Sequence, residues 1–310
     1  MRHALAVLAC LAFAALAGAQ ESELAKITGE TCTVLETTHF RMDTFMDAAG
    51  NQALAEKCEK AYEILGKVFP IPETGLWRSR CRVFGCQSED AWFKLNDTFK
   101  GDQQTKELRK RLAHTRQRGK SPIAAACMDH IPLGQSGFDQ AILHNVGHVA
   151  IWAAMKEAKP PMWIDEGFAS WLEMATTGHA FEYCVGKGTS AVDPKKDWKN
   201  GDLWIILLKE GAQWKKDVPL DPLRKKKDFN DMSHEERAKA WSIVDFLIAT
   251  DAAKFAKFIL ALKDKVQPKT ESGSAEYGPG ADEQALCEAY DPKWSFAAVE
   301  REWRSWIAKK

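Results

Sequence analysis

The sequence predicts an α+β fold in which a small mixed sheet precedes a mostly helical half. Segments rich in β-branched and alternating apolar residues occur before residue 135. Through most of residues 136–310, apolar residues recur at intervals of three and four, which is the spacing of an amphipathic helix. A strand-helix-strand run in the first part is typical of a mixed sheet backed by helices.

The first half alternates between these two spacings. Strands are expected over Thr31–Arg41, Arg80–Phe84 and Pro122–Ile131, and helices over Asn51–Phe69 and Glu89–Phe99. The polar and basic stretch Lys106–Lys120 predicts a solvated helix and loop rather than a nucleic-acid contact. Pro132–Asp139 predicts a turn in which Ser136 or Asp139 caps the next helix.

The second half is expected to be helical apart from its connections. Helices are expected within Ile142–Glu173 and over His234–Ala249, Ala253–Lys263 and Ser295–Ala308, with a short apolar element at Trp204–Leu208. Loops are expected at Val185–Asn200, at the charged run Arg224–Asp228 and at the Gly-, Pro- and Ser-rich stretch Gln267–Asp282.

The N-terminus has the pattern of a secretory signal peptide. Met1-Arg2-His3 is basic, an apolar run follows from Ala4 to Ala17, and the next residues are small. We expect cleavage before Gln20, which removes residues 1–19 and leaves a secreted or periplasmic protein. The run is too short for a membrane span, and no later segment is long and apolar enough to be one. The mature chain is expected to combine an N-terminal α/β part over 20–135 with a helical part over 136–310 in one continuous domain.

Charge and cysteine content narrow the classes of partner. The chain has 43 basic and 43 acidic residues, a balance that does not point to nucleic acid. Of its eight cysteines, Cys10 lies in the signal peptide, so seven remain and at least one of these is free or pairs between chains. One or two disulfides and an absence of disulfides both remain open.

The stretch Ile142–Glu173 carries the residues that indicate chemistry. His144 and His148 are four residues apart in a helical pattern, so both imidazoles project from one helix face. Glu166 follows in a second helical pattern, which begins after Pro160-Pro161. Two histidines at this spacing and a carboxylate on a neighbouring helix are the ligand set of a catalytic zinc site with an open fourth position.

These motifs resemble those of the gluzincin peptidases, the peptidase MA-like clan that includes thermolysin and aminopeptidase N. That clan carries H-E-x-x-H on one helix and W-x-x-E-G-x-A about eighteen residues later. This chain has HNVGH and then WIDEGFA. The resemblance covers most of the mature chain in its order of elements, but only the central stretch is specific to the motif. It implies a zincin-like fold.

The resemblance implies that His144, His148 and Glu166 are metal ligands. Zinc suits imidazole and carboxylate donors, although another divalent transition metal could occupy the same set. Ser170 and Glu173 lie one and two turns beyond Glu166, which makes them candidates for outer partners that orient a ligand imidazole. Asp165 is a further candidate for such a partner.

Asn145 is the main departure from the family pattern. It stands where the clan has the glutamate that takes a proton from the zinc-bound water. An amide cannot accept that proton, and general acid-base help is typically worth ~10²–10⁴ in rate. Asp165 is the nearest substitute carboxylate in sequence, but neighbouring side chains on a helix diverge.

A second departure concerns oxyanion stabilisation. Members of the clan place a tyrosine about four residues before the tryptophan that corresponds to Trp241, and here that position is Arg237, with His234 nearby. Either side chain is a candidate oxyanion donor, and a solvated helix start explains both equally well. The clan also binds peptides against an edge strand, for which Ala124–Asp129 is the candidate.

Three hypotheses therefore remain. In the first, an exported zincin-like protein binds a divalent metal through His144, His148 and Glu166 and is a pseudoprotease. The second is an active metallohydrolase with a relocated base. The third is a metal-free helical protein with a structural or peptide-binding role, in which the histidines only pack.

Overall fold

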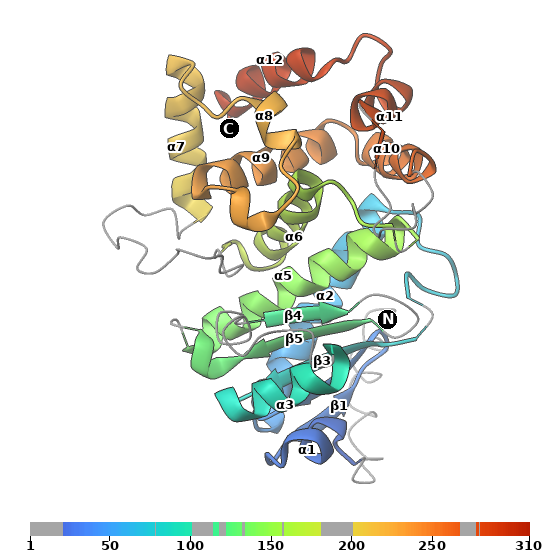
Figure 1. Ribbon diagram of the computed structural model, residues 1–310, viewed down its shortest axis with the longest axis vertical. Coiled ribbons are helices and arrows are strands. Elements are labelled where there is room, and N and C mark those ends of the chain that lie inside the picture. Colours follow the sequence, from blue (N-terminus) through green and yellow to red (C-terminus); the bar gives the residue numbers. More distant parts are fainter. Residues whose placement is uncertain are drawn as a thin grey trace, which may run out of the picture.

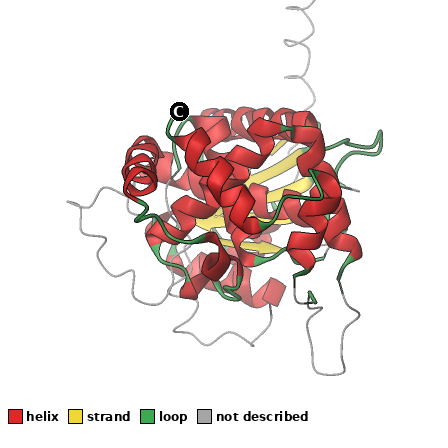
Figure 2. Ribbon diagram, turned by 90° about the horizontal axis from the view of Figure 1, so that it is seen from above, coloured by secondary structure: helices red, strands yellow, loops and turns green. Residues whose placement is uncertain are grey.

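The computed structural model describes residues 21–77, 79–100, 114–117, 122–131, 134–156, 158–180, 201–266, 277–278 and 280–310. It is an α+β protein, as the sequence predicts. A small mixed sheet and its helices lie in one half of the molecule, and the C-terminal helices form the other (Figure 1). Viewed from above, the sheet lies beneath a layer of helices (Figure 2).

The sheet has five strands in the order β1-β2-β3-β5-β4. Their bounds are β1 Thr33–Glu36, β2 Phe40–Thr44, β3 Cys81–Cys86, β4 His114–Gln117 and β5 Ile123–Cys127. The central pairs β2/β3 and β3/β5 are parallel, whereas the outer pairs β1/β2 and β5/β4 are antiparallel. The sheet is therefore mixed, and its two edges are β1 and β4.

Two strand predictions were wrong in detail. The segment Thr31–Arg41 is not one strand, because the chain turns after Glu36 and β2 pairs back on β1. Thr37 closes this turn: its N–H donates to the Phe40 carbonyl, with N and O 2.9 Å apart. The basic segment Lys106–Lys120 contains strand β4, because ladder pairing needs only the backbone and tolerates a polar sequence at a sheet edge.

The predicted edge strand Ala124–Asp129 is not an edge. Its residues 124–127 belong to β5, which pairs with β3 on one side and with β4 on the other. Its last residues form a 3-10 turn, Met128–His130. The edge on this side of the sheet is β4.

The helices follow the predicted order closely. Their bounds are α1 Glu23–Thr28, α2 Ala48–Val68, α3 Glu89–Lys100, α5 Gly134–Ala154, α6 Met162–Thr177, α7 Gly201–Trp214, α8 Leu220–Arg224, α9 His234–Thr250, α10 Ala252–Asp264, α11 Ala281–Ala289 and α12 Phe296–Ile307. The predicted helices within Asn51–Phe69, Glu89–Phe99, His234–Ala249, Ala253–Lys263 and Ser295–Ala308 are confirmed. The predicted loop Val185–Asn200 lies outside the described residues.

Several helix boundaries differ from expectation. Helix α5 begins at Gly134, so Ser136 and Asp139 lie inside it and do not cap it. Asp139 instead forms an ion pair with Lys57 on α2. The apolar element at Trp204–Leu208 is part of the longer α7, and α1, α8 and α11 were not predicted.

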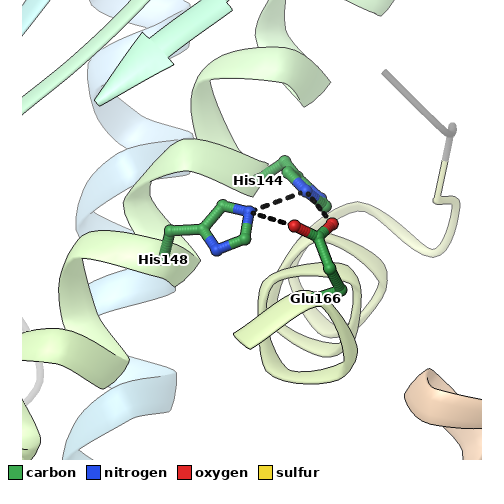
Figure 3. Close-up of side chains that lie close together, drawn as sticks. All are labelled: His144, His148 and Glu166. Carbon is green, nitrogen blue, oxygen red and sulfur yellow. Dashed lines mark hydrogen bonds and ion pairs between the residues drawn. The ribbon is translucent and has the colours of Figure 1, made fainter. Parts of the chain in front are cut away.

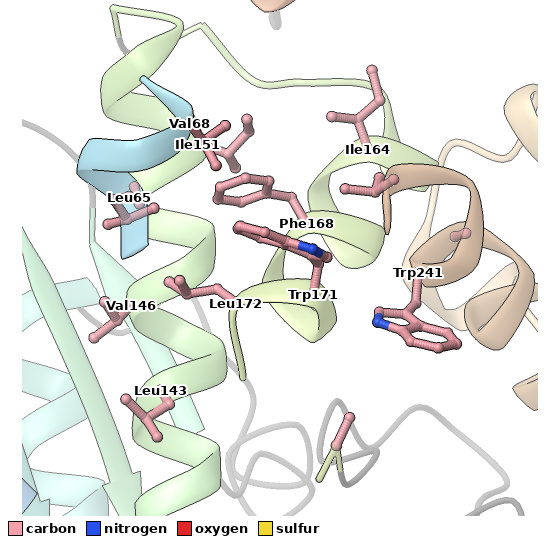
Figure 4. Close-up of a cluster of buried hydrophobic side chains, with 14 of the residues drawn as sticks. Leu65, Val68, Leu143, Val146, Ile151, Ile164, Phe168, Trp171, Leu172 and Trp241 are labelled. Atoms are coloured by element: carbon pink, nitrogen blue, oxygen red, sulfur yellow. The ribbon is translucent and has the colours of Figure 1, made fainter. Parts of the chain in front are cut away.

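The larger core lies where α6 is packed between α5 and α9 (Figure 4). This cluster includes Leu143, Val146 and Ile151 of α5, Phe168 and Leu172 of α6, and Leu65 and Val68 of α2. No helix in the described ranges is long and apolar enough to cross a bilayer. The six cysteines that the structure describes are all free thiols, and Cys10 and Cys184 lie outside the described residues.

Candidate metal centre

Helix α5 carries both histidines through the interior of the protein. Every residue from Gly137 to Trp152 is buried, which is the pattern of a helix that is surrounded by other elements rather than lying on the surface. His144 and His148 are only 2% and 0% exposed. Burial on all sides leaves polar side chains here dependent on partners from the neighbouring helices.

Helix α6 presents Glu166 to these histidines. It begins directly after Pro161 and ends at Gly178, whose φ of 82° is the left-handed conformation that glycine adopts at a helix end. Glu166 is 2% exposed, and Asp165 and Glu173 on the same helix are fully buried. One short helix thus contributes three buried carboxyl groups to the region.

Two glycines allow the three central helices to approach closely. A Cβ atom added at Gly147, between the two histidines, would lie 2.6 Å from the Cα of Ala169 on α6. A Cβ atom at Gly167, next to Glu166, would lie 2.6 Å from the carbonyl oxygen of Ala240 on α9. Backbone therefore packs on backbone at both crossings, and only glycine fits there.

The candidate ligand atoms form a compact triangle (Figure 3). The two Nε2 atoms of His144 and His148 are 3.1 Å apart. The Glu166 carboxylate places one oxygen 3.6 Å from the His144 Nε2 and the other 3.5 Å from the His148 Nε2. Tetrahedral zinc with ligands at ~2.0–2.1 Å requires ~3.3 Å between ligand atoms. With one Glu166 oxygen taken as the ligand, the three ligand atoms lie within 4.8 Å of one another, so these three residues could hold a metal ion.

The outer nitrogens of both imidazoles contact carboxylates from α6. His148 Nδ1 lies 2.6 Å from Asp165 Oδ1, and His144 Nδ1 lies 3.3 Å from Glu173 Oε2. A carboxylate at this position accepts the Nδ1–H and leaves the Nε2 lone pair directed at the metal position. The contacts of Asp165 and Glu173 thus match the tautomer that metal binding needs. Ser170 is buried but makes no side-chain hydrogen bond to either imidazole within the described part of the chain.

Asn145 has a structural contact with the sheet. Its Nδ2 donates to the carbonyl oxygen of Ala125 on β5 at 3.2 Å, which ties α5 to the sheet. Residues 124–126 are alanines, and small side chains let the helix lie close to this strand. The amide at this position can hold a hydrogen bond but cannot take up a proton.

The two candidate oxyanion donors lie in the first turn of α9. Ser233 and Glu236 form a capping box there. Burial, with the Arg237 charge, lowers the pKa of His234 below its ordinary value, which favours the neutral ring. The Arg237 guanidinium lies 4.0 Å from the centre of the Phe229 ring, and its NH2 group donates to the Phe229 carbonyl at 3.3 Å. A role for either residue in stabilising an oxyanion stays a prediction.

The sequence analysis missed a second buried polar cluster, at the contact of α9 with α12. The ammonium of Lys239, 0% exposed, donates to Asp217 at 2.6 Å and lies 3.2 Å from the centre of the Trp303 ring. Arg304 donates to the other oxygen of Asp217 at 3.0 Å. Burial lowers the pKa of Lys239 to about 8, although Asp217 and Glu300 oppose this shift. Lys239 falls within a regular helical pattern, and the sequence holds no signal that this lysine is inside the protein.

No family model matches the chain, and a search of curated proteins finds no match.

Proposed function

We propose that this protein is an exported, zincin-like metal-binding protein that has lost the usual hydrolytic base and acts as a pseudoprotease. The grouping of His144, His148 and Glu166 carries the proposal, because two imidazole nitrogens and a carboxylate oxygen that lie within 4.8 Å of one another are the donor set of a zinc site. The likeness of HNVGH and WIDEGFA to the gluzincin motifs supports it. The signal-like pattern of residues 1–19 supports export.

Zinc is the proposed ion. Two imidazoles and one carboxylate are the donors of many zinc hydrolases, and a bound zinc ion would supply Lewis acidity at its open position. The same donor set also suits iron, cobalt or nickel. Asp165 and Glu173 would fix the ring orientations of the two histidines, as carboxylate partners of metal-bound imidazoles commonly do.

Asn145 is the reason to propose an inactive centre. In a hydrolytic site of this kind a carboxylate receives a proton from the attacking water and passes it to the leaving group. The Asn145 amide instead donates to Ala125 on β5. Asp165, the nearest carboxylate in sequence, lies 2.6 Å from Nδ1 of His148, one of the proposed ligands.

The proposed ligand of a pseudoprotease is a peptide. A peptide that extends the sheet on the side of α5 would pair with β4, since β4 is the edge strand there. Helix α5 passes next to β4 (Figure 1).

Metal analysis and peptidase assays test the proposal together. Purified mature protein, reconstituted with zinc and dialysed, should contain one zinc ion per chain, and His148→Ala should contain none. The wild type should then cleave casein and short peptides no faster than its chelator-treated form. Absence of stoichiometric metal would leave only the metal-free hypothesis. Turnover at an ordinary peptidase rate that a chelator abolishes would instead establish the active hydrolase.

The variant Asn145→Glu makes the peptidase assay a direct test of the missing base. The carboxylate restores a base beside the first ligand, so any hydrolysis should rise by ~10²–10⁴ over the wild type. The variant also loses the hydrogen bond to Ala125, which should cost ~1 kcal/mol of stability. Asn145→Gln is the matched control, because it changes the side-chain length without adding a base. Equal rates in wild type, Glu and Gln variants that all carry zinc would show that the missing base is not what limits hydrolysis.

A further inference from the structure

Helix α7 exposes large apolar side chains at the outer edge of the helical half (Figure 1). Across the described residues, the large hydrophobic side chains with high exposure are Ile206 at 50%, Trp214 at 67% and Leu260 at 41%, and two of these three lie on α7. The opposite face of α7 is buried, with Trp204 5.6 Å from Trp241 of α9 between ring centres. Contiguous exposed apolar patches with a polar rim are typical of surfaces that bind proteins or membranes.

The exposed apolar residues lie along one side of α7, with the exposed Glu210 between Leu207 and Trp214. Leu203 and Leu207 are partly exposed and lie one turn or less from Ile206, and Trp214 lies two turns further on. We call Leu203, Ile206, Leu207 and Trp214 the α7 stripe. Spacings of three, four and seven residues place these side chains along one side of the helix.

Basic charge is concentrated at the tryptophan end of the α7 stripe. Lys215 and Lys216 are exposed and follow Trp214 directly. The next acidic residue, Asp217, is buried and bound to Lys239 and Arg304, so it does not face solvent beside the two lysines. Glu210 is an exposed acidic residue of this helix, and it lies between Ile206 and Trp214.

The backbone at Lys215 has a conformation that favours glycine over lysine. The Lys216 N–H donates to the Gly211 carbonyl at 2.8 Å and the Lys215 N–H donates to the Ala212 carbonyl at 3.3 Å, which is the Schellman pattern of a helix end. Lys215 has a φ of 53°, in the left-handed region that favours glycine. The chain therefore accepts backbone strain at a position where glycine would be more stable.

We propose that the α7 stripe, with Lys215 and Lys216, docks this protein on a membrane surface that carries anionic lipid headgroups. An apolar helix face with tryptophan and flanking lysines is the composition of helices that lie in the membrane interface. Lysines near such a surface each contribute attraction to anionic lipids. Four side chains are too few to supply the roughly 800 Å² per partner of a stable dimer interface, whereas a lipid surface needs no complementary shape.

Vesicle flotation with the full mature protein tests the proposal. The protein should float with vesicles of phosphatidylcholine and phosphatidylglycerol in equal parts and remain unbound to pure phosphatidylcholine. Raising the salt concentration should release it, since the lysine contribution is screened. Trp214→Ala should lower the partition coefficient about ten-fold, from the loss of aromatic burial.

Three substitutions separate the effect of charge on lipid binding from effects on the stability of the fold. Lys215→Gly should raise the thermal unfolding midpoint, because it relieves the left-handed strain, and yet lower the partition coefficient about five-fold. Lys216→Ala should lower it by a similar factor, whereas Glu210→Gln should raise it about five-fold. Leu260→Ala and Lys257→Ala, on α10, remove an exposed apolar and an exposed basic side chain elsewhere and should change nothing.

Other results would overturn the proposal. Equal partition into both vesicle types, or binding that Trp214→Ala and Lys215→Gly leave unchanged, would remove the α7 stripe from any lipid contact. Absence of flotation, with a dimer in sedimentation equilibrium that Trp214→Ala dissociates, would assign the α7 stripe to a second copy of this chain.

Discussion

Two buried polar clusters lie on opposite sides of the α6–α9 contact, and they are built in different ways. Around Asp217, the chain supplies its own cations, Lys239 and Arg304, at hydrogen-bond distance from one carboxylate. Between α5 and α6, the inward-facing atoms of His144, His148 and Glu166 are two imidazole nitrogens and carboxylate oxygens, within 4.8 Å of one another. The first cluster is complete within the protein, whereas the second has the donor set of an ion site.

This difference indicates how a buried polar cluster can be given a structural or a functional role. Buried charges need compensation, from a partner in the chain or from a bound ion. The Asp217 cluster fastens α12 and the α7–α8 connection to α9, which is a structural task. The comparison therefore predicts that each cluster responds to a different perturbation.

The largest expected effect is on the Asp217 cluster. Lys239→Met removes the cation from a fully buried pair and should lower the free energy of unfolding by ~3–5 kcal/mol, measured by urea titration. Zinc content per folded chain should not change. Lys257→Met, an exposed lysine on α10, is the control and should stay within ~0.5 kcal/mol of the wild type. Loss of zinc in Lys239→Met would show that the clusters are coupled through the contact of Ala240 with Gly167.

The next effect belongs to the α5–α6 site. Free zinc at a thousand times its dissociation constant should raise the free energy of unfolding of the wild type by ~4 kcal/mol, because zinc binds the folded state. His148→Ala should abolish this gain, and Lys239→Met should retain it. Calorimetry with and without zinc measures both. An equal zinc response in wild type and His148→Ala would place the ion elsewhere.

Gly147→Ala tests whether the close backbone packing of α5 on α6 determines the distances between the candidate ligand atoms. The added methyl group would lie 2.6 Å from Ala169 Cα, so α5 must shift away from α6, at ~1–3 kcal/mol. Zinc affinity should fall although no ligand is altered, as measured by competition with a chromogenic chelator. Gly66→Ala is the matched helix glycine, where the methyl would only touch Ile71 Cδ1 at 3.7 Å. That control should keep full affinity and gain slightly in stability.

The smallest expected effect is the loss of stability that acid causes at the Asp217 cluster. Burial raises the pKa of Asp217, but hydrogen bonds from Arg304 and Lys239 outweigh it and hold the pKa below the ordinary value. A carboxyl group with a lowered folded pKa stabilises the fold above its unfolded pKa of ~3.9, and this stability is lost as the pH falls through the folded pKa. Urea titrations from pH 5 downward should show a loss in the wild type that Asp217→Asn lacks. Parallel curves for the two proteins would contradict this origin.

The sequence predicted the grouping of His144, His148 and Glu166 better than it predicted the sheet. Helical spacing alone puts His144 and His148 on one face, and the fixed length of the connection brings Glu166 opposite them. Strand β4 escaped prediction because an edge strand needs no apolar alternation, and the turn at Thr37 lies inside a uniformly β-prone segment. Both errors concern pairing, which depends on residues that are distant in sequence.

Side-chain partners were harder to predict than ligands. Ser170 and Glu173 share a helix face, and only the longer glutamate reaches His144. Asp139 looked like a helix cap, yet the helix starts one turn earlier and the carboxylate meets Lys57. Lys239 gave no sign of burial because its partners, Asp217 and Arg304, lie on other elements. Spacing along one helix is visible in a sequence, whereas contacts between elements are decided by packing.

The order of residues around the candidate centre has a consequence for folding. Both imidazoles, the Glu166 carboxylate and the two outer carboxylates all fall between His144 and Glu173, on two consecutive helices. Contacts between residues so near in sequence close small loops and cost little chain entropy. The helical hairpin could therefore assemble, and capture an ion, before the distant strands of the sheet have found one another.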